Sequence, residues 1–264
     1  MKLSFSTLGC PDWKWGDILA AAKDLEYDGI EVRGVNDQLY VPRIFAGREE
    51  TVKEELTRLN LEMPCITSAI DLHNLNNRAN NLKAGQEYVD CALSVGTKYI
   101  RVLGDYHPEP RQDVDAGLVK EVAAQIGAYA REKGVVILIE TNGYFANTER
   151  LARLLEEIGN PAVAALWDMH HPYRFMGEPP QATVENLKGY IKHVHLKDSV
   201  MEGDQVRYRM MGAGDMPIEA CVTALTDTGY DGYYSLEWTK RWNLALEEPG
   251  IAFANFVSYM SDYR

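Results

Sequence analysis

The segment that decides the fold is VVILIE, residues 135–140. It is apolar except for its last residue, and it follows Gly134 at the end of a long amphipathic stretch, residues 116–133. A short apolar run without alternating polar positions is typical of a parallel strand covered on both faces. The preceding stretch has the length and periodicity of a helix, and Gly134 suits its carboxyl cap. Together the two segments predict one helix-strand unit of a parallel sheet.

The same unit recurs along the chain. The predicted strands are rich in apolar and β-branched residues: Leu3–Gly9, Gly29–Arg33, Glu62–Ser68, Tyr99–Gly104, Val135–Glu140, Ala164–Met169, Ile191–Lys197 and Tyr233–Trp238. The predicted helices between them include Trp15–Glu26, Glu49–Asn60, Arg78–Val95, Ala116–Lys133, Thr148–Ile158 and the short Gln181–Tyr190. An open doubly wound sheet is the rival architecture. Eight consecutive units without G-x-G-x-x-G after the first strand favour one α/β domain over residues 1–264, a (β/α)8 TIM barrel.

Composition narrows the classes of function. The formal net charge of −12 argues against a nucleic-acid binder, because such proteins neutralise phosphates with basic patches. No apolar run approaches the roughly 18 residues that a membrane span requires, so we expect no membrane association and a cytoplasmic location. The four cysteines, Cys10, Cys65, Cys91 and Cys221, lie far apart without a C-x-x-C pair. They predict reduced, buried side chains and not disulfides or a zinc ribbon.

Four polar residues stand at the ends of apolar strands, where TIM barrels build their active sites. Glu140 ends VVILIE, Asp168 follows AALW, His195 lies in IKHVHLKD and Glu237 ends YYSLE. Three carboxylates and one imidazole suit Mn²⁺ first, with Mg²⁺, Co²⁺, Fe²⁺ or Zn²⁺ as alternatives. Burying three carboxylates together is costly unless a cation balances them or some are protonated. The pattern therefore predicts one divalent metal ion held by these four residues.

The strings LIETN, LWDMHH, HVHLKDS and SLEW, in this order and spacing, resemble the sugar phosphate isomerase/epimerase superfamily of xylose isomerase-like TIM barrels. The resemblance implies metal ligation by Glu140, Asp168, His195 and Glu237. It also implies that His171 contacts the substrate, and that Glu140 and Glu237 act as metal-bound acid and base, as in the ketose epimerases. The chain departs from the epimerase pattern at Ala146 and Met201, where those enzymes carry a glutamate and an arginine. Simple ketose 3-epimerisation is therefore not established by the resemblance.

Further polar and aromatic residues are expected at the mouth of the barrel. A lining of this kind suits a hydroxyl-rich ligand, because aromatic rings cover the C–H faces of a sugar while polar groups bind its hydroxyls. Arg33 and Arg101 have an alternative role as partners of strand-end acids such as Glu31. The predicted substrate-binding residues are Trp13, Arg33, His73, Arg101, Asn142, Lys197 and Trp238.

The glycine-rich stretch MGAGDMP, residues 211–217, precedes a predicted helix. Such a loop can present backbone N–H groups to a phosphate. Its two glycines are more often required by backbone geometry, with Asp215 as the helix cap. The stretch is therefore no evidence for a phosphorylated substrate.

We expect an enzyme that moves a proton next to a carbonyl of a sugar, keto-sugar or cyclitol with the help of the metal. An isomerase or epimerase is the first prediction. A lyase or dehydratase acting on a keto-sugar, a 3-keto glycoside or an inosose is the alternative, with His171 as general acid. A metal-dependent endonuclease fits six histidines and a negative charge poorly. A noncatalytic binding subunit, a homo-oligomer and a partner subunit stay open.

Overall fold

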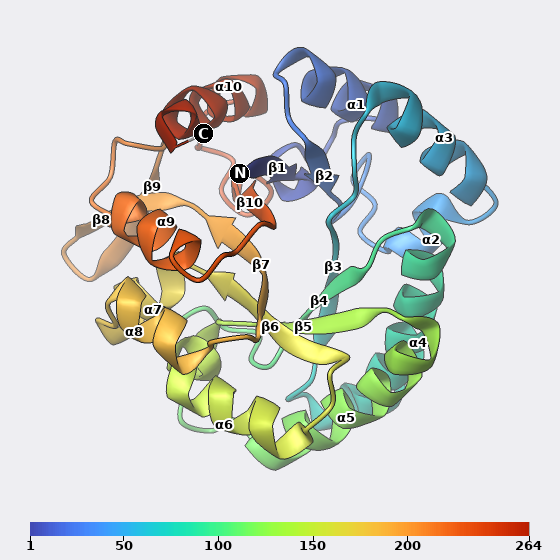
Figure 1. Ribbon diagram of the computed structural model, residues 1–264, viewed down its shortest axis with the longest axis vertical. Helices are drawn as coiled ribbons and strands as arrows, with labels where there is room; N and C mark the ends of the chain where they lie inside the picture. Colours follow the sequence, from blue (N-terminus) through green and yellow to red (C-terminus); the bar gives the residue numbers. More distant parts are fainter. Residues whose placement is uncertain (264) are drawn as a thin grey trace.

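Eight parallel strands form the centre of the molecule, and helices surround them (Figure 1). The computed structural model describes residues 1–263. The strand order is β2-β1-β10-β7-β6-β5-β4-β3, and two bridges, Gly29 to Glu62 and Val32 to Ile66, join the edges β2 and β3. The predicted TIM barrel is confirmed. Its strands are β1 Lys2–Ser6, β2 Gly29–Glu31, β3 Cys65–Asp71, β4 Tyr99–Leu103, β5 Val136–Glu140, β6 Val163–Asp168, β7 Ile191–Leu196 and β10 Tyr233–Leu236.

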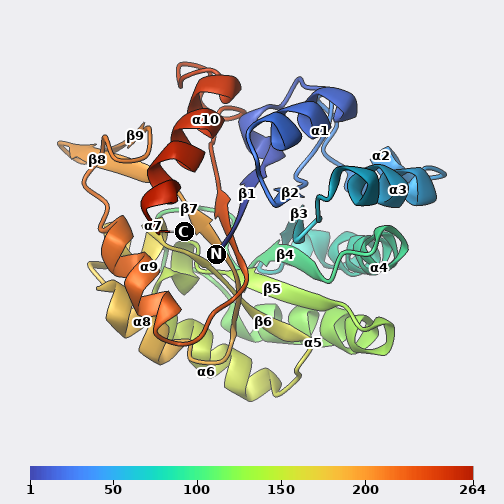
Figure 2. The same ribbon diagram turned by 45° about the horizontal axis from the view of Figure 1, so that its top comes forward.

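The helices pack on the outside of the strands, as the turned view also makes plain (Figure 2). Gly96, Gly134 and Gly159 end α4, α5 and α6 with left-handed backbone, as expected for helix carboxyl caps. The helices are α1 Trp15–Asp24, α2 Val41–Phe45, α3 Glu49–Leu59, α4 Arg78–Val95, α5 Ala116–Lys133, α6 Thr148–Ile158, α7 His170–Met176, α8 Pro180–Asn186, α9 Ile218–Thr226 and α10 Pro249–Met260.

Several predicted bounds were wrong. The first strand ends at Ser6, because residues 7–9 form a 3-10 turn whose Leu8 N–H is accepted by the Ser6 hydroxyl. The third strand begins at Cys65 and not at Glu62. Glu62 is joined to β2 only by an isolated bridge to Gly29, which is too little pairing to make residues 62–64 part of the strand. A hairpin of β8 Asp198–Glu202 and β9 Gln205–Arg209 follows β7 and was not predicted.

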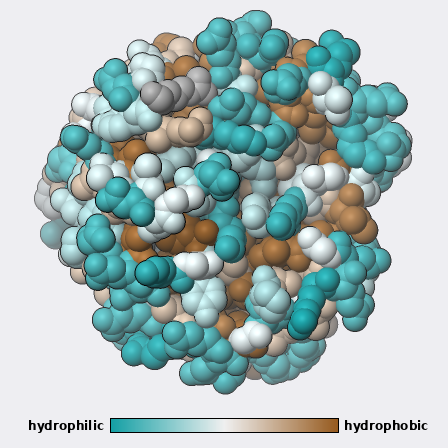
Figure 3. Space-filling view, in the orientation of Figure 1, coloured by the Kyte–Doolittle hydropathy of each residue, from teal (hydrophilic) through white to brown (hydrophobic). Residues whose placement is uncertain are grey.

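Apolar side chains fill the layer between the strands and the helices, where Phe5, Phe253 and Trp167 are buried. A second, smaller apolar cluster of Leu138, Ala164 and Leu166 is formed by β5 and β6. The space-filling view shows hydrophilic residues covering much of one face, with hydrophobic residues in its hollows (Figure 3). Among the described residues, no helix combines the length and apolarity that a membrane crossing requires.

Candidate active site at the carboxyl end of the barrel

The four predicted metal ligands meet at one end of the barrel. Glu140 and Asp168 are the last residues of β5 and β6, His195 lies near the end of β7, and Glu237 follows β10. Each is at most 6% exposed. One ligand atom from each residue lies within 4.8 Å of the other three. The structure therefore brings the four side chains together, and their role in metal binding stays a prediction.

The His195 ring points into this cluster. Its Nδ1 lies 3.5 Å from Glu237 Oε1, 3.8 Å from Glu140 Oε1 and 4.0 Å from Asp168 Oδ2, yet it makes no hydrogen bond. Its Nε2 is held by Glu31 Oε1 at 2.8 Å. Burial opposes a charge on the ring, but the Glu31 and Glu237 carboxylates outweigh it and hold the pKa of His195 well above its usual range. The Nδ1 atom of His195 therefore faces the carboxylates of Glu140, Asp168 and Glu237.

Two cations of the chain lie among the carboxylates. Lys197 Nζ donates to Asp168 Oδ2 and Glu237 Oε2. Arg101 Nε lies 3.0 Å from Glu140 Oε2. Burial opposes the Lys197 charge, but Asp168 and Glu237 keep the pKa of its ammonium well above the usual value. These two cations of the chain balance part of the negative charge of the three carboxylates, which the sequence analysis assigned to a metal ion or to protonation.

The donor set nevertheless fits one divalent ion. Such ions bind nitrogen and oxygen at about 2.1 Å, so ligand atoms sharing an ion lie roughly 3 to 4 Å apart. The separations of 3.5, 3.8 and 4.0 Å around His195 Nδ1 fall in this range. A metal-binding histidine usually has its second nitrogen held by a carboxylate, as Glu31 holds Nε2 here. Lys197 contacts two of the candidate ligands, and its ammonium shares Asp168 Oδ2 with the metal site while it takes the other oxygen of Glu237, Oε2.

His171, in α7, lies beside the cluster and is 4% exposed. Its Nδ1 is 3.2 Å from the Thr141 carbonyl oxygen, which only accepts, so Nδ1 carries the ring proton. The same nitrogen lies 3.9 Å from Asp168 Oδ2. Burial lowers the pKa of His171 despite the nearby Asp168 carboxylate, so the ring is neutral at neutral pH. A general acid role stays a prediction.

Arg33 and Asn142 were predicted to bind substrate. Arg33 is 6% exposed, and burial together with the neighbouring Arg101 charge lowers its pKa to about 10. The Glu237 carboxylate opposes this lowering of the Arg33 pKa. Asn142 donates from Nδ2 to the carbonyl oxygens of Asp105 at 2.7 Å and His107 at 3.1 Å. Its amide therefore fastens the loop after β4, while a substrate contact stays a prediction.

The remaining predicted binding residues make contacts within the protein. His73 Nδ1 accepts the backbone N–H of Asp115 at 3.0 Å, which joins the loop after β3 to the start of α5. Trp13 packs edge-on against Phe253, with ring centroids 5.9 Å apart. Trp238 is 2% exposed, and its Nε1 donates to the Glu247 carbonyl oxygen at 3.0 Å. These three side chains have structural partners, and their contacts with a ligand stay predictions.

Neither Glu31 nor His193 was predicted to belong to the site. The alternative that Arg33 or Arg101 pairs with a strand-end acid holds for Arg101, whose partner is Glu140. The acid given as the example, Glu31, instead accepts hydrogen bonds from His193 and His195. The available signal was the alternation H-x-H-x-K over residues 193–197, since side chains two apart in a strand share one face. That face is the barrel interior, where a charged residue such as Glu31 must find donors.

The glycine-rich loop before α9 has its backbone donors occupied. The Asp198 carboxylate accepts the N–H groups of Gly212 at 3.0 Å, Gly214 at 2.9 Å and Met216 at 3.2 Å. These donors are the ones a phosphate would have used. The helix begins at Ile218 without a side-chain cap, and Asp215 pairs with Arg174 instead, so the predicted capping by Asp215 was wrong.

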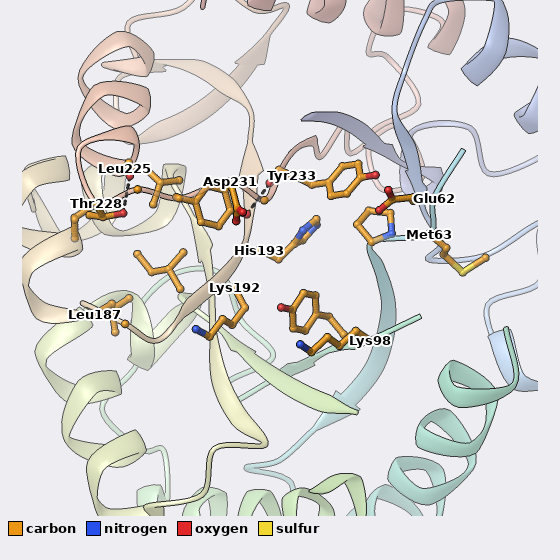
Figure 4. A pocket seen from close by; sticks show the side chains of 18 of the residues that line it. Glu62, Met63, Lys98, Leu187, Lys192, His193, Leu225, Thr228, Asp231 and Tyr233 are labelled. Carbon is orange, nitrogen blue, oxygen red and sulfur yellow. Dashed lines mark hydrogen bonds between the residues drawn. The ribbon is translucent and has the colours of Figure 1, made fainter. Parts of the chain in front are cut away.

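The opposite end of the barrel holds a cavity of about 1310 Å³. Residues near the starts of the strands line it, among them Lys98, Lys192, His193 and Tyr233. Figure 4 shows these side chains spaced around the opening, with Glu62 at its side. None of the four residues of the carboxyl-end cluster lines this cavity, and of its described lining residues only His193 belongs to a group that could hold a metal ion, with Glu31 and His195.

Two known enzymes are similar in sequence to this chain. Fructoselysine 3-epimerase from Shigella flexneri is 23% identical over 236 residues, which cover 82% of this chain and 82% of that enzyme. Inosose dehydratase from Clostridium perfringens is 26% identical over 145 residues, 48% of this chain and 46% of that enzyme. The similar curated enzymes therefore include a sugar epimerase and a cyclitol dehydratase.

Solved structures share the fold. A probable 3-DHS dehydratase from Bacillus anthracis superimposes with a TM-score of 0.81 at 18% identity, over 100% of both chains. The IOLI protein, whose structure holds a zinc atom, gives a TM-score of 0.78 at 18% identity, over 100% of this chain and 99% of that one. The family model described as xylose isomerase-like TIM barrel matches residues 19–254. The chain therefore belongs to the xylose isomerase-like TIM barrel family.

Proposed function

We propose that the chain is a divalent-metal-dependent isomerase or epimerase that moves a proton next to a carbonyl of a sugar, keto-sugar or cyclitol. The observation that carries the proposal is the cluster of Glu140, Asp168, His195 and Glu237, with His195 Nδ1 buried and without a hydrogen bond. The epimerase and dehydratase relatives support a small polyhydroxylated substrate. The zinc atom in the structure of one neighbour supports a metal-binding role for this fold, and Mn²⁺ is our first expectation for the ion.

A divalent ion bound by these ligands would polarise a carbonyl and the adjacent hydroxyl and make the neighbouring C–H more acidic. Glu140 and Glu237 then serve as the proton-transfer groups. They come from strands separated by β6 and β7, so they flank the site from two directions. Burial opposes the Glu140 charge, but Arg101 and His195 hold the pKa of Glu140 below its usual range. The Glu140 carboxylate is therefore ionised at neutral pH and able to accept a proton.

Lys197 and Arg101 hold the carboxylates in place from inside the site. Lys197 joins Asp168 to Glu237, and Arg101 reaches Glu140 while donating from Nη1 to the Ser68 carbonyl oxygen at 2.9 Å. Both cations are buried and fixed by partners on neighbouring strands. We infer that they orient the acidic groups and contribute donors for substrate hydroxyls.

The first experiment is elemental analysis of the purified protein beside Glu140→Gln and His195→Ala. We expect about one Mn, Mg, Co, Fe or Zn per wild-type chain and loss of the metal in both variants. Keto-sugars are then incubated with the wild type in deuterated water, and deuterium at the carbon next to the carbonyl is measured by NMR. Absence of metal after Mn²⁺ is supplied, with no exchange into any keto-sugar, would contradict the proposal.

A dehydratase is the second candidate, and the position of His171 favours it. This imidazole lies beside Asp168, and its Nδ1 proton is directed to the Thr141 carbonyl oxygen, so Nε2 carries the lone pair. Nε2 would take up the proton removed from the substrate carbon and pass it to the departing hydroxyl. Two of the similar enzymes are dehydratases by name. Product analysis separates the two reactions, because a dehydratase yields an unsaturated product 18 mass units lighter whereas an epimerase leaves the mass unchanged.

A further inference from the structure

Glu31 is a charged residue in the interior of the barrel, and it is completely buried. It ends β2, and its hydrogen-bond partners come from β3, β7 and β10. Oε1 lies 2.8 Å from His195 Nε2 and 2.5 Å from Thr67 Oγ1. Oε2 lies 2.7 Å from His193 Nε2 and 2.7 Å from Ser235 Oγ. Each carboxylate oxygen is therefore held by two groups.

This arrangement places a proton on Nε2 of both histidines. A carboxylate only accepts hydrogen bonds, so both imidazoles must donate to Glu31 through Nε2. For a neutral His195 the remaining lone pair is then on Nδ1, the atom that faces the cluster of Glu140, Asp168 and Glu237. The bond to Glu31 also sets the rotation of the His195 ring.

We propose that Glu31 is the positioning residue of the metal site: its carboxylate fixes the ring orientation and tautomer of His195 so that Nδ1 binds the divalent ion. The inference rests on the proposed metal-dependent function. A carboxylate on the second nitrogen of a metal-binding histidine strengthens its binding, and loss of that carboxylate typically lowers metal affinity 10- to 100-fold. Glu31 does not reach the reacting atoms itself, because His195 lies between it and the cluster.

His193 supplies a matched control within the same network. It makes the same kind of bond to Glu31, and it is 1% exposed. Its Nε2 is taken by Glu31, and it is not among the four residues of the carboxyl-end cluster. If Glu31 contributed to stability alone, loss of its bond to His193 and loss of its bond to His195 would have equivalent effects. A positioning role makes only the His195 side of the carboxylate important for metal binding.

The test is titration of metal-free protein with Mn²⁺ by calorimetry and with Co²⁺ by visible absorption, for wild type, Glu31→Gln and His193→Gln. We expect Glu31→Gln to weaken Mn²⁺ binding by about 10- to 100-fold and to alter the Co²⁺ spectrum. The amide carries no charge, and one of its two orientations presents a donor to His195. We expect His193→Gln to bind Mn²⁺ within about threefold of wild type, with an unchanged Co²⁺ spectrum. Melting of the metal-free proteins measures any loss of stability separately.

The outcomes separate the two proposals. If the wild type binds metal and the two variants weaken binding equally, the positioning role is overturned while the metal site stands. If the wild type binds neither Mn²⁺ nor Co²⁺, the proposed function fails and this inference fails with it.

If Glu31→Gln does not fold, Thr67→Val and Ser235→Ala replace it, each removing one hydroxyl from one oxygen of Glu31. Thr67→Val must then change the Co²⁺ spectrum more than Ser235→Ala, and equal spectra would overturn the proposal.

Discussion

The two ends of the barrel differ in what they offer a ligand. The carboxyl end gathers Glu140, Asp168, His195 and Glu237 within a few ångströms, and every one of these side chains is buried. The amino end holds a cavity of about 1310 Å³ that is lined by exposed lysines such as Lys98 and Lys192. In TIM barrels the amino end serves stability and the carboxyl end serves chemistry. Convergence of reactive groups, and not the volume of a cavity, therefore locates the site.

The largest expected difference between the ends is in catalysis. Glu237→Gln removes a proton-transfer group and a metal ligand, so we expect the rate of deuterium exchange to fall by about 10²- to 10⁴-fold. Glu62→Gln makes the same chemical change at the amino-end cavity, where the Glu62 carboxylate meets the exposed Lys2. We expect its rate to stay within about twofold of wild type. A comparable loss in both variants, measured by NMR, would refute the assignment of chemistry to one end.

The two ends should also differ in how much stability is lost when a glycine is replaced by alanine. A Cβ at Gly214 would lie 2.0 Å from Asp198 Oδ1, so Gly214→Ala must break the loop that the Asp198 carboxylate holds. We expect a loss of about 2 to 4 kcal/mol in the free energy of unfolding. Gly96, which lines the amino-end cavity, has φ +78° and only the Lys53 side chain near its Cβ position, at 3.9 Å. Gly96→Ala should cost only about 1 kcal/mol, the penalty of left-handed backbone. Denaturant unfolding of both variants measures the two values, and equal losses would show that the Asp198 contact is unimportant.

Metal removal tests the carboxyl end alone. A ligand that binds the folded state at 100 times its Kd stabilises it by about 2.7 kcal/mol, which corresponds to roughly 5 to 10 °C in Tm for a protein of this size. We expect Mn²⁺ to raise the Tm of metal-free wild type by this amount and EDTA to reverse it. His195→Ala should abolish the shift, whereas Lys192→Ala at the other end should keep it. A shift that persists in His195→Ala would place the ion elsewhere.

The sequence was sufficient for the barrel and for the set of side chains that cluster. Apolar runs such as VVILIE mark strands covered on both faces, and a polar residue ending such a run must lie at the sheet edge. Because parallel strands share one direction, Glu140 and Asp168 had to meet. The pattern could not give the strand bounds, since the turn at residues 7–9 is buried like the strand before it.

The partners of the cluster could not be predicted, because they come from strands far apart in the sequence. Glu31 and His195 are 164 residues apart, and only closure of the barrel brings them into contact. Lys197 and Arg101 carried charge that was visible in the sequence, yet their bonds to Glu237 and Glu140 depend on side-chain direction. The charge balance of the site therefore required the three-dimensional structure.

The smallest expected effect belongs to the amino end and appears at alkaline pH. Tyr230 lines the cavity and donates its hydroxyl to the Tyr233 carbonyl oxygen at 2.9 Å. Burial raises the pKa of Tyr230 well above its usual value. A raised pKa in the folded state means that the stabilisation is fully present below the unfolded value of about 10 and is lost as pH rises above it. We expect wild type to lose stability between pH 9 and pH 11, and Tyr230→Phe to lose less over the same interval.

Unfolding in guanidinium at both pH values measures the difference, with Tyr106→Phe, at an exposed tyrosine, as the control. An identical pH dependence in wild type and Tyr230→Phe would show that the Tyr230 hydroxyl does not link alkaline pH to the stability of the amino end.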